Sequence, residues 1–197
     1  MAEWKLFDGE PPVYTTPAWY LTRERAPHLE EPGQRERLIR TAEIVRSVCE
    51  AGRHESVVDL GCGDGGLLSL LQAQVVPPVD CWGYDLSPAA VSAARTVRKV
   101  RAWQLDIVTD ELTWGQVAVA TEVLEHLVDP HAYVRRIAGH CQAVVASSPA
   151  YETDRNHYEF HTWAWDTSGY RKLFEQAGFT VWHQEIVQSF QVVGAIR

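Results

Sequence analysis

SVVDLGCGDGG, residues 56–66, is the most informative segment of this chain. It begins with apolar, largely β-branched residues that are typical of a short buried strand, and a run of glycines follows at once. The next residues, Leu67–Gln74, have the composition of a helix. Glycine permits positive φ angles and leaves no side chain between the backbone and a ligand. A strand, a glycine turn and a helix in this order therefore predict a ligand-binding βα unit.

The same alternation of short apolar strands with helices continues to the C-terminus. It predicts an α/β fold, doubly wound and Rossmann-like, with a mostly parallel seven-stranded sheet and an antiparallel last strand. The antiparallel pair is expected because no helix separates the final two strands. The predicted strands are Ser56–Leu60, Cys81–Asp85, Val100–Leu105, Val117–Thr121, Gln142–Ser147, Phe179–His183 and Phe190–Ile196. The predicted helices are Gln34–Glu50, Leu67–Gln74 (stopped by Pro77-Pro78), a helix from the Ser87 cap to about Lys99, one beginning at Asp129-Pro130, and Thr167–Ala177.

Length and composition indicate one domain with an N-terminal extension. The chain has 197 residues, of which 46% are hydrophobic and 22% charged, values that are ordinary for a soluble protein. Residues 1–33 are rich in proline, aromatic residues and charge and lack an apolar period, so they are predicted to form an irregular N-terminal arm or cap that can carry a short helix. Residues 34–197 are predicted to form the main domain, which contains the glycine turn.

Membrane insertion and broad nucleic-acid binding are not expected. No apolar stretch approaches the length of a membrane span, and the formal net charge of −8 argues against general duplex binding. The four cysteines form no CxxC pair, which favours reduced thiols in a cytoplasmic protein.

Three acidic residues near the glycine turn bear on which cofactor it binds, and two of them, Asp59 and Asp106, argue against a dinucleotide. The turn also satisfies GxGxxG, the fingerprint of dinucleotide binding. Asp85 ends the second predicted strand, where it can accept hydrogen bonds from ribose hydroxyls. This feature is compatible with a dinucleotide and does not decide the cofactor. Asp59, however, lies inside the first strand, where a dinucleotide enzyme normally keeps an apolar residue. Asp106 follows the third strand, at a position that has no role in the dinucleotide fingerprint.

VVDLGCGDG, GYDLSPAAV and LDI together resemble the first three motifs of the class I S-adenosylmethionine (AdoMet)-dependent methyltransferases, and the similarity extends from about residue 56 to the C-terminus. The resemblance implies that Asp59 and the glycine turn border the methionine moiety, Asp85 the ribose, and Asp106 with Ile107 the adenine. An NAD-dependent oxidoreductase and a non-catalytic AdoMet-fold partner subunit are the alternatives. The implied cofactor-binding residues are Asp59, Gly61, Cys62, Gly63, Gly65, Asp85, Leu86, Asp106, Ile107 and Thr121.

A second group of polar residues follows the fourth predicted strand, in TEVLEH, residues 121–126. One helical turn here would bring Glu122, Glu125 and His126 to one face. Two carboxylates and an imidazole can hold Mg²⁺ or Mn²⁺, and a hydroxyl coordinated to such a cation loses its proton more readily. The segment also resembles a common variant in methyltransferases that bind no metal, in which the histidine packs or acts as a base.

A further histidine, His161, precedes Trp165 by four residues. The combination ExxEH and HxxxW resembles the metal site of small-RNA 3′-end 2′-O-methyltransferases, and similar elements occur in ubiquinone-pathway O-methyltransferases. The chain departs from that pattern because Asp166 and Thr167 replace the expected threonine and basic residue, and because no RNA-binding domain accompanies it. His157 is an alternative to His161. The implied metal ligands are Glu122, Glu125, His126 and His161, and the candidate catalytic residues are His126, His161 and Glu122.

We expect transfer of a methyl group from AdoMet to an oxygen or nitrogen of a small-molecule acceptor, with an RNA 3′ end as the alternative acceptor. The segment of about twenty residues before Thr167 is long for a structureless connection and is predicted to be a functional loop. Its aromatic residues either stack on a planar acceptor or seal the edge of the sheet. Tyr14, Trp19 and Tyr20 of the N-terminal arm are predicted to provide a second wall.

Overall fold

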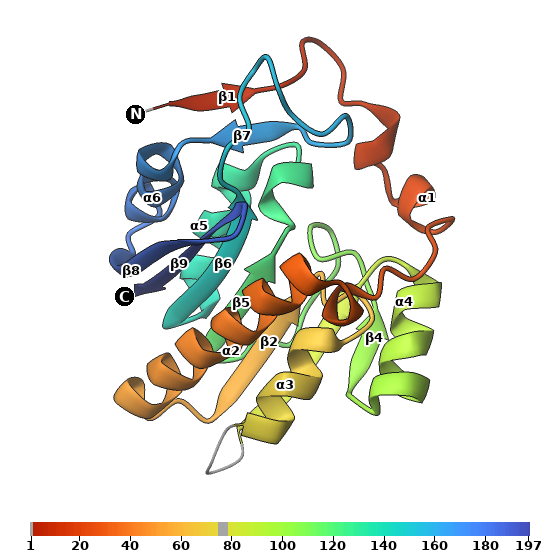
Figure 1. Ribbon diagram of the computed structural model, residues 1–197, viewed down its shortest axis with the longest axis vertical. Helices are drawn as coiled ribbons and strands as arrows, with labels where there is room; N and C mark the ends of the chain where they lie inside the picture. Colours follow the sequence, from red (N-terminus) through yellow and green to blue (C-terminus); the bar gives the residue numbers. More distant parts are fainter. Residues whose placement is uncertain (1, 75–78) are drawn as a thin grey trace.

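The computed structural model describes residues 2–74 and 79–197 and is built around a seven-stranded sheet (Figure 1). From one edge to the other, the sheet contains β4 (Ala102–Gln104), β3 (Asp80–Asp85), β2 (Ser56–Leu60), β5 (Val117–Thr121), β6 (Ala143–Pro149), β9 (Phe190–Ile196) and β8 (Thr180–Val187). Strands β2 to β6 pair in parallel, whereas β9 is antiparallel to both β6 and β8. The predicted Rossmann-like sheet with an antiparallel last strand is therefore confirmed.

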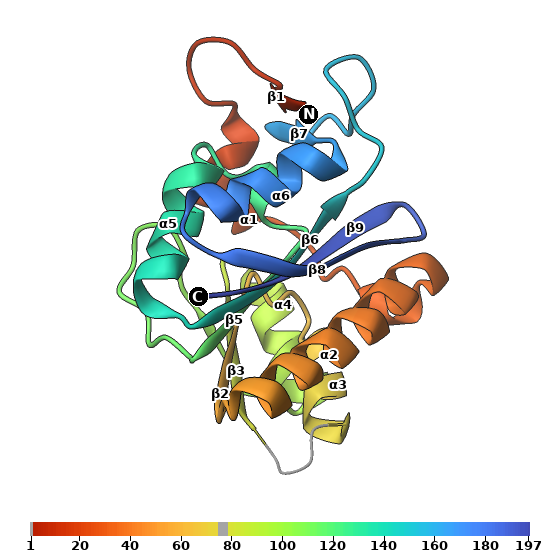
Figure 2. The ribbon, with the colours of Figure 1, turned by 90° about the vertical axis from the view of Figure 1, so that its left-hand side faces the viewer.

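Helices cover both faces of this sheet (Figure 2). One face packs against α2 (Pro32–Gly52), α3 (Gly66–Gln74) and α4 (Pro88–Ala93), and the other against α5 (Pro130–His140) and α6 (Thr167–Gln176). Because successive strand residues point to opposite faces, Val57 and Val58 belong to two different core clusters, and both are fully buried. This double burial explains why the parallel strands are continuous apolar runs in the sequence. Among the described helices, none is long and apolar enough to span a membrane.

Capping residues account for the helix starts. The side chain of Ser87 accepts a hydrogen bond from Ala90 N at 3.2 Å, and that of Asp129 accepts one from Ala132 N at 2.8 Å, so both predicted caps are confirmed. The helix α2 begins at Pro32, slightly before the predicted Gln34, because proline is well suited to the first helical position.

The helix α4 continues as a π-helical turn, η3 (Ala94–Arg98), and the chain leaves it where Lys99 adopts a φ of +60°. The predicted stop at Pro77-Pro78 lies outside the described residues. The strand predicted to begin at Val100 is shorter than expected, since β4 starts only at Ala102.

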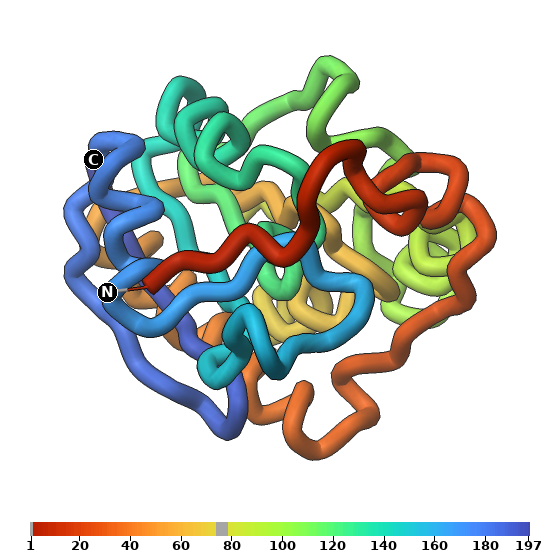
Figure 3. Tube along the Cα trace, turned by 90° about the horizontal axis from the view of Figure 1, so that it is seen from above, coloured from red at the N-terminus to blue at the C-terminus, as the bar shows by residue number. Residues whose placement is uncertain are grey.

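The N-terminal arm has more regular structure than the sequence indicates. Its strand β1 (Glu3–Lys5) pairs antiparallel with β7 (Trp163–Trp165), which lies in the segment predicted to be a loop. Two strands this short give too few residues for a detectable alternation. The arm then crosses the carboxyl end of the large sheet (Figure 3). It continues through η1 (Val13–Thr15), α1 (Pro17–Tyr20) and η2 (His28–Glu30).

Ion pairs fasten the N-terminal arm to the glycine turn. The buried carboxylate of Asp64, which lies in the turn, accepts hydrogen bonds from Arg25 of the arm at 2.9 Å and from Arg98 of η3 at 3.0 Å. Both guanidinium groups also contact Glu30. In addition, Ser87 donates to the carbonyl oxygen of Arg23 at 3.1 Å. The arm is therefore held beside the turn that the sequence identifies as the ligand site.

Candidate functional site

The glycine turn lies where the strand order of the sheet reverses, with β3 on one side of β2 and β5 on the other. Such a switch point is where open α/β sheets bind ligands. Gly61, Gly63 and Gly65 have φ angles of +79°, +53° and +79°. A Cβ atom on Gly61 would lie 2.5 Å from a methyl carbon of Val123. The turn therefore requires glycine both for its backbone conformation and for the close approach of a neighbouring loop.

Asp85 holds the turn in place from the end of β3. Its Oδ2 accepts a hydrogen bond from Gly63 N and its Oδ1 accepts one from Ser87 N, both at 2.8 Å. Burial raises the pKa of Asp85, and these two backbone donors oppose the rise. Each carboxylate oxygen has a second lone pair. Asp85 can therefore accept further hydrogen bonds from a ligand without releasing the turn.

Asp59 lies deeper, at the end of β2, and its side chain is only 1% exposed. Its Oδ1 has no hydrogen-bond partner among the described residues. Burial raises the pKa of Asp59 to about 7, and nearby Asp85 contributes to the rise while Arg37 opposes it. A buried acceptor without a partner is unfavourable, so a donor on a bound ligand would stabilise it.

A cavity of about 510 Å³ opens at these strand ends, within the size range of small-molecule sites. The N-terminal arm contributes Thr15, Pro17 and Tyr20 to its wall, and the turn after β5 contributes Glu122 and His126. Of the predicted cofactor residues, those that line the cavity are Gly61, Asp85, Leu86, Asp106 and Ile107. Those outside its lining are Asp59, Cys62, Gly63, Gly65 and Thr121.

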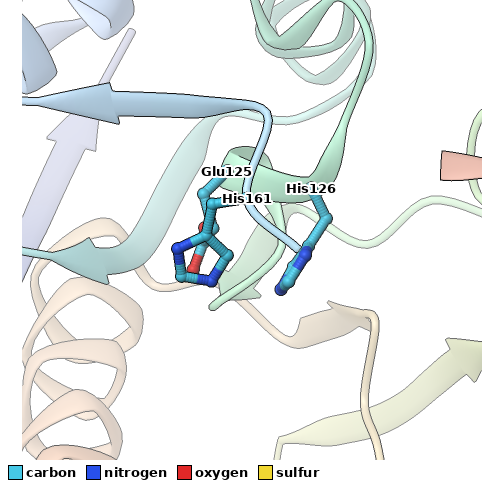
Figure 4. A group of neighbouring side chains, drawn as sticks. All are labelled: Glu125, His126 and His161. Carbon is cyan, nitrogen blue, oxygen red and sulfur yellow. The ribbon is translucent and has the colours of Figure 1, made fainter. Parts of the chain in front are cut away.

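Beside this cavity, three of the four predicted metal ligands lie together (Figure 4). Glu125 and His126 belong to a short 3₁₀ turn, η4 (Leu124–His126), and His161 comes from the loop before β7. One ligand atom from each residue lies within 4.8 Å of the others. The two imidazole rings are 4.7 Å apart between centroids. Glu125, His126 and His161 are called the Glu/His cluster below.

The predicted helical turn from Glu122 to His126 is wrong. Glu122 has a left-handed φ of +56°, and its N–H donates to Ser147 O at 3.0 Å, which extends the pairing of β5 with β6 by one residue. Its Oε1 accepts a hydrogen bond from the Ser147 hydroxyl at 2.8 Å. Glu122 thus lines the cavity without joining the Glu/His cluster.

Hydrogen bonds orient both histidines of the cluster. His126 Nδ1 lies 3.0 Å from Phe160 O. Because a carbonyl only accepts, Nδ1 carries the proton and Nε2 is left with a lone pair. His161 Nδ1 lies 2.6 Å from a carboxylate oxygen of Glu152, an arrangement that orients metal-binding histidines in other proteins. Burial and, to a smaller extent, nearby His161 lower the pKa of His126 to about 4, so this ring is neutral at physiological pH.

Glu125 completes the cluster as a fully buried acid. Neither of its carboxylate oxygens has a hydrogen-bond partner among the described residues. Burial and then the proximity of Glu122 raise its pKa well above the usual range. A carboxylate without donors, next to two imidazoles with available Nε2 atoms, is a donor set suited to a divalent cation. The residues present therefore fit a metal ion.

Sequence reasoning missed two residues of this region. Glu152, the partner of His161, lies in an irregular loop and carries no sequence signal. Arg37 of α2 is fully buried and donates to the Ser147 hydroxyl at 3.1 Å, behind Glu122. The available signal was its position one helical turn before Thr41 on the buried face of α2.

The aromatic residues of the predicted loop contact the N-terminal arm. The ring of Phe160 lies 5.5 Å from that of Tyr14 and 5.1 Å from that of Trp19, between centroids. His157, the alternative to His161, contacts Tyr158 O and does not belong to the cluster. Loop and arm therefore pack against each other at the mouth of the site.

A family model described as "Methyltransferase domain" matches residues 30–184. The N-methyltransferase NodS of Bradyrhizobium japonicum WM9, solved with S-adenosylhomocysteine, has a TM-score of 0.68 and 15% identity over 93% of this chain and 97% of its own. Magnesium protoporphyrin IX methyltransferase of Synechocystis PCC 6803 has a TM-score of 0.65 and 15% identity, over 91% and 92%.

The methyltransferase domain of the bacterial protein CtHen1-CN is also similar. Its TM-score is 0.64 at 21% identity, and the likeness covers 82% of this chain and all of that domain. At such identities the likeness is one of fold. No curated protein matches the chain in sequence.

Proposed function

The chain belongs to the methyltransferase domain family, with the class I AdoMet-dependent fold, and on this premise we propose that it methylates an oxygen atom of a small-molecule acceptor. Family membership confirms a methyltransferase over the oxidoreductase that the glycine spacing also allowed. The observation that carries the proposal is the cavity, which extends from Asp85 and Asp106 to Glu122 and His126 beneath the N-terminal arm.

The proposed cofactor site uses the part of the cavity near the glycine turn. The unused lone pairs of Asp85 are suited to the two ribose hydroxyls, and Leu86 and Ile107 provide apolar contacts for the adenine. The unpartnered Oδ1 of Asp59 lies behind the turn and is proposed to stabilise the positively charged methionine end. AdoMet, when bound, supplies an activated methyl group, so the contribution of the protein is mainly the positioning of donor and acceptor.

The Glu/His cluster is the proposed site that acts on the acceptor hydroxyl. Glu125, His126 and His161 are proposed to hold Mg²⁺ or Mn²⁺, and such a cation, when bound, makes a hydroxyl more acidic. Without a cation, His126 is the proposed base, because it is the histidine of the cluster that lines the cavity and its Nε2 can accept a proton. Glu122, which also lines the cavity, is proposed to accept a hydrogen bond from the acceptor.

The N-terminal arm is proposed to be a cap on the methyltransferase domain of residues 34–197. Thr15, Pro17 and Tyr20 of the arm line the cavity, and the packing of Phe160 on Tyr14 and Trp19 joins the arm to the loop before β7. Such a wall encloses a small acceptor. The net charge of −8 further favours a small molecule over a polyanion.

An RNA 3′ end is the second candidate acceptor. It is favoured by one observation, the assembly of Glu125, His126 and His161 into the cluster that resembles the site of the small-RNA 3′-end enzymes. In that case the arm would have to move away to admit the nucleotide.

Formation of S-adenosylhomocysteine tests these proposals directly. The protein would be incubated with AdoMet and Mn²⁺, either with a panel of phenols and catechols or with a short RNA that ends in a 3′-terminal ribose, and the product quantified by mass spectrometry. We expect turnover with members of the phenol panel and its loss on addition of EDTA. Turnover with the RNA but with no member of the phenol panel would establish the second candidate. Turnover that EDTA leaves unchanged would contradict the metal site.

A further inference from the structure

Thr162 occupies the junction between the Glu/His cluster and the strand β7, and its side chain is completely buried. Its N–H donates to Glu125 O at 2.7 Å. Its hydroxyl lies 2.8 Å from Glu125 O and 2.8 Å from Leu127 O. Its own carbonyl oxygen accepts a hydrogen bond from Leu6 N at 2.8 Å. Every polar group of this residue therefore contacts a segment that is distant in the sequence.

These contacts connect the separate segments that form the site. Thr162 follows His161 directly, while its partner Glu125 belongs to the turn that supplies the other two members of the cluster. Leu6 lies next to β1, so the same residue also receives the N-terminal arm. A hydrogen-bonded link one residue away from His161 limits how far its ring can move relative to Glu125 and His126.

Other contacts of His161 restrain it much less. Its ring is held by Glu152, which belongs to the same irregular loop, and its backbone N–H donates to Tyr158 O at 3.0 Å, also within that loop. These bonds shape the loop but do not attach it to η4. The loop and β7 are attached to η4 and the residues after it by the bonds of Thr162, by the bond between His126 Nδ1 and Phe160 O, and by Trp163 Nε1, which donates to Val128 O at 3.3 Å. Among these links, that of Thr162 is fully buried and lies outside the cluster itself.

We propose that Thr162 is a positioning residue, which holds the loop carrying His161 against the turn carrying Glu125 and His126 and couples both to the N-terminal arm. The inference rests on the proposed function of the cluster. Because ligand groups must be held within a fraction of an ångström of their working geometry, loosening this link displaces His161 from its neighbours. The arm, through Leu6, secures the same junction from the opposite side.

The variant Thr162→Val removes the hydroxyl while keeping the shape of the side chain and the backbone N–H. Thr162→Ser keeps the hydroxyl and serves as the rescue variant. Thr41→Val is the matched control, since Thr41 is also fully buried but its hydroxyl has no partner among the described residues.

The first readout is the long-range ¹H–¹⁵N spectrum of the imidazole rings in the metal-free protein. We expect Thr162→Val to shift or broaden the ring signals of His126 and His161, whereas Thr162→Ser and Thr41→Val retain the wild-type spectrum. Unchanged signals in Thr162→Val would overturn the proposal. This readout needs neither a metal ion nor turnover, so it separates the role of Thr162 from the proposed function.

The second readout is the affinity for Mn²⁺ by titration calorimetry. Residues that orient metal ligands typically change metal affinity about 10–100-fold. We therefore expect Thr162→Val to bind Mn²⁺ at least about tenfold more weakly while AdoMet affinity stays within about twofold. Unchanged Mn²⁺ affinity would count against positioning, and absence of Mn²⁺ binding by the wild type would refute the cation site alone. If Thr162→Val does not fold, Leu6→Pro is used instead, because proline lacks the N–H that donates to Thr162 O. Ring signals of His126 and His161 equal to those of the wild type in Leu6→Pro would overturn the coupling to the arm.

Discussion

The cofactor half and the Glu/His half of the site are assembled in different ways. The proposed cofactor half comes from residues 59–107, in which three strands that lie side by side in the sheet end at the same edge. The Glu/His half joins η4 to the loop before β7, and the N-terminal arm lies against both. The first half is thus positioned by sheet pairing, whereas the second depends on a few hydrogen bonds between distant segments.

The two halves also differ in how their acids are stabilised. In the cofactor half, Asp85 accepts two backbone N–H bonds and still has free lone pairs. In the other half, Glu125 has no hydrogen-bond donor among the described residues, although it is fully buried. Changes in the first half should therefore weaken cofactor binding, and changes in the second should impair the reaction while leaving cofactor binding intact.

Asp85→Ala tests the cofactor half with the largest expected effect. The substitution removes the proposed ribose contact and also releases Gly63 N of the glycine turn. Hydrogen bonds to a charged group contribute about 1.5–3 kcal/mol each, so AdoMet affinity is expected to fall by at least about 100-fold. Calorimetry measures this, with the exposed Asp154→Ala as control. An affinity equal to that of the wild type would exclude Asp85 from the ribose site.

Glu125→Gln tests the other half. The amide has nearly the same shape but cannot ionise, so it cannot supply the negative charge that a bound cation requires. Activation of an acceptor hydroxyl contributes about 10²–10⁴-fold to a rate, so turnover is expected to fall about 100-fold or more while AdoMet affinity stays within about twofold. Glu111→Gln, at an exposed site, is the control. A loss of AdoMet affinity as large as the loss of turnover would show that the two halves are not separable.

Asp59→Asn addresses the buried acid behind the glycine turn. Its pKa is raised from 3.8 to about 7, so between these values the folded state keeps a proton that the unfolded state releases. The wild type therefore loses stability as the pH rises through this window. Asparagine does not titrate. From about pH 5 to about pH 8, the free energy of unfolding of the variant relative to the wild type should rise by about 3 kcal/mol.

Urea denaturation without cofactor at several pH values measures this difference. Asp154→Asn, which changes an exposed acid in the same way, should follow the wild type at every pH. Parallel pH profiles of the wild type and Asp59→Asn would refute the raised pKa.

Glu152→Gln is expected to have the smallest effect. It weakens the bond that orients the ring of His161 without removing a member of the cluster. Mn²⁺ affinity should fall about tenfold, the lower end of the range for such partners, and Glu159→Gln in the same loop should leave it unchanged. If Glu152→Gln lowered Mn²⁺ affinity as much as Glu125→Gln does in the same titration, Glu152 itself would be placed among the ligands.

Where residues are close in sequence and their conformation is imposed by glycine or by strand ends, sequence reasoning succeeded. The glycine turn, the position of Asp85 and the order of strands and helices followed from patterns of a few neighbouring residues. Glu122 was assigned wrongly to a helical face, because the pairing of its N–H with Ser147 O holds it in a left-handed conformation. Helical spacing contains no information about that contact.

The sequence by itself determined the α/β sheet, the glycine turn at its switch point and the cofactor class, because these depend on local backbone preferences and burial of apolar strands. The tertiary structure alone decided that β1 pairs with β7, that Glu152 orients His161 and that Thr162 links the loop to η4. The β1–β7 pairing and the contacts of Thr162 join residues that are far apart in the chain, and the bond between Glu152 and His161 lies within one irregular loop. Such bonds leave no periodic pattern in a sequence, since polar residues of the same type are equally suited to a solvent-exposed loop.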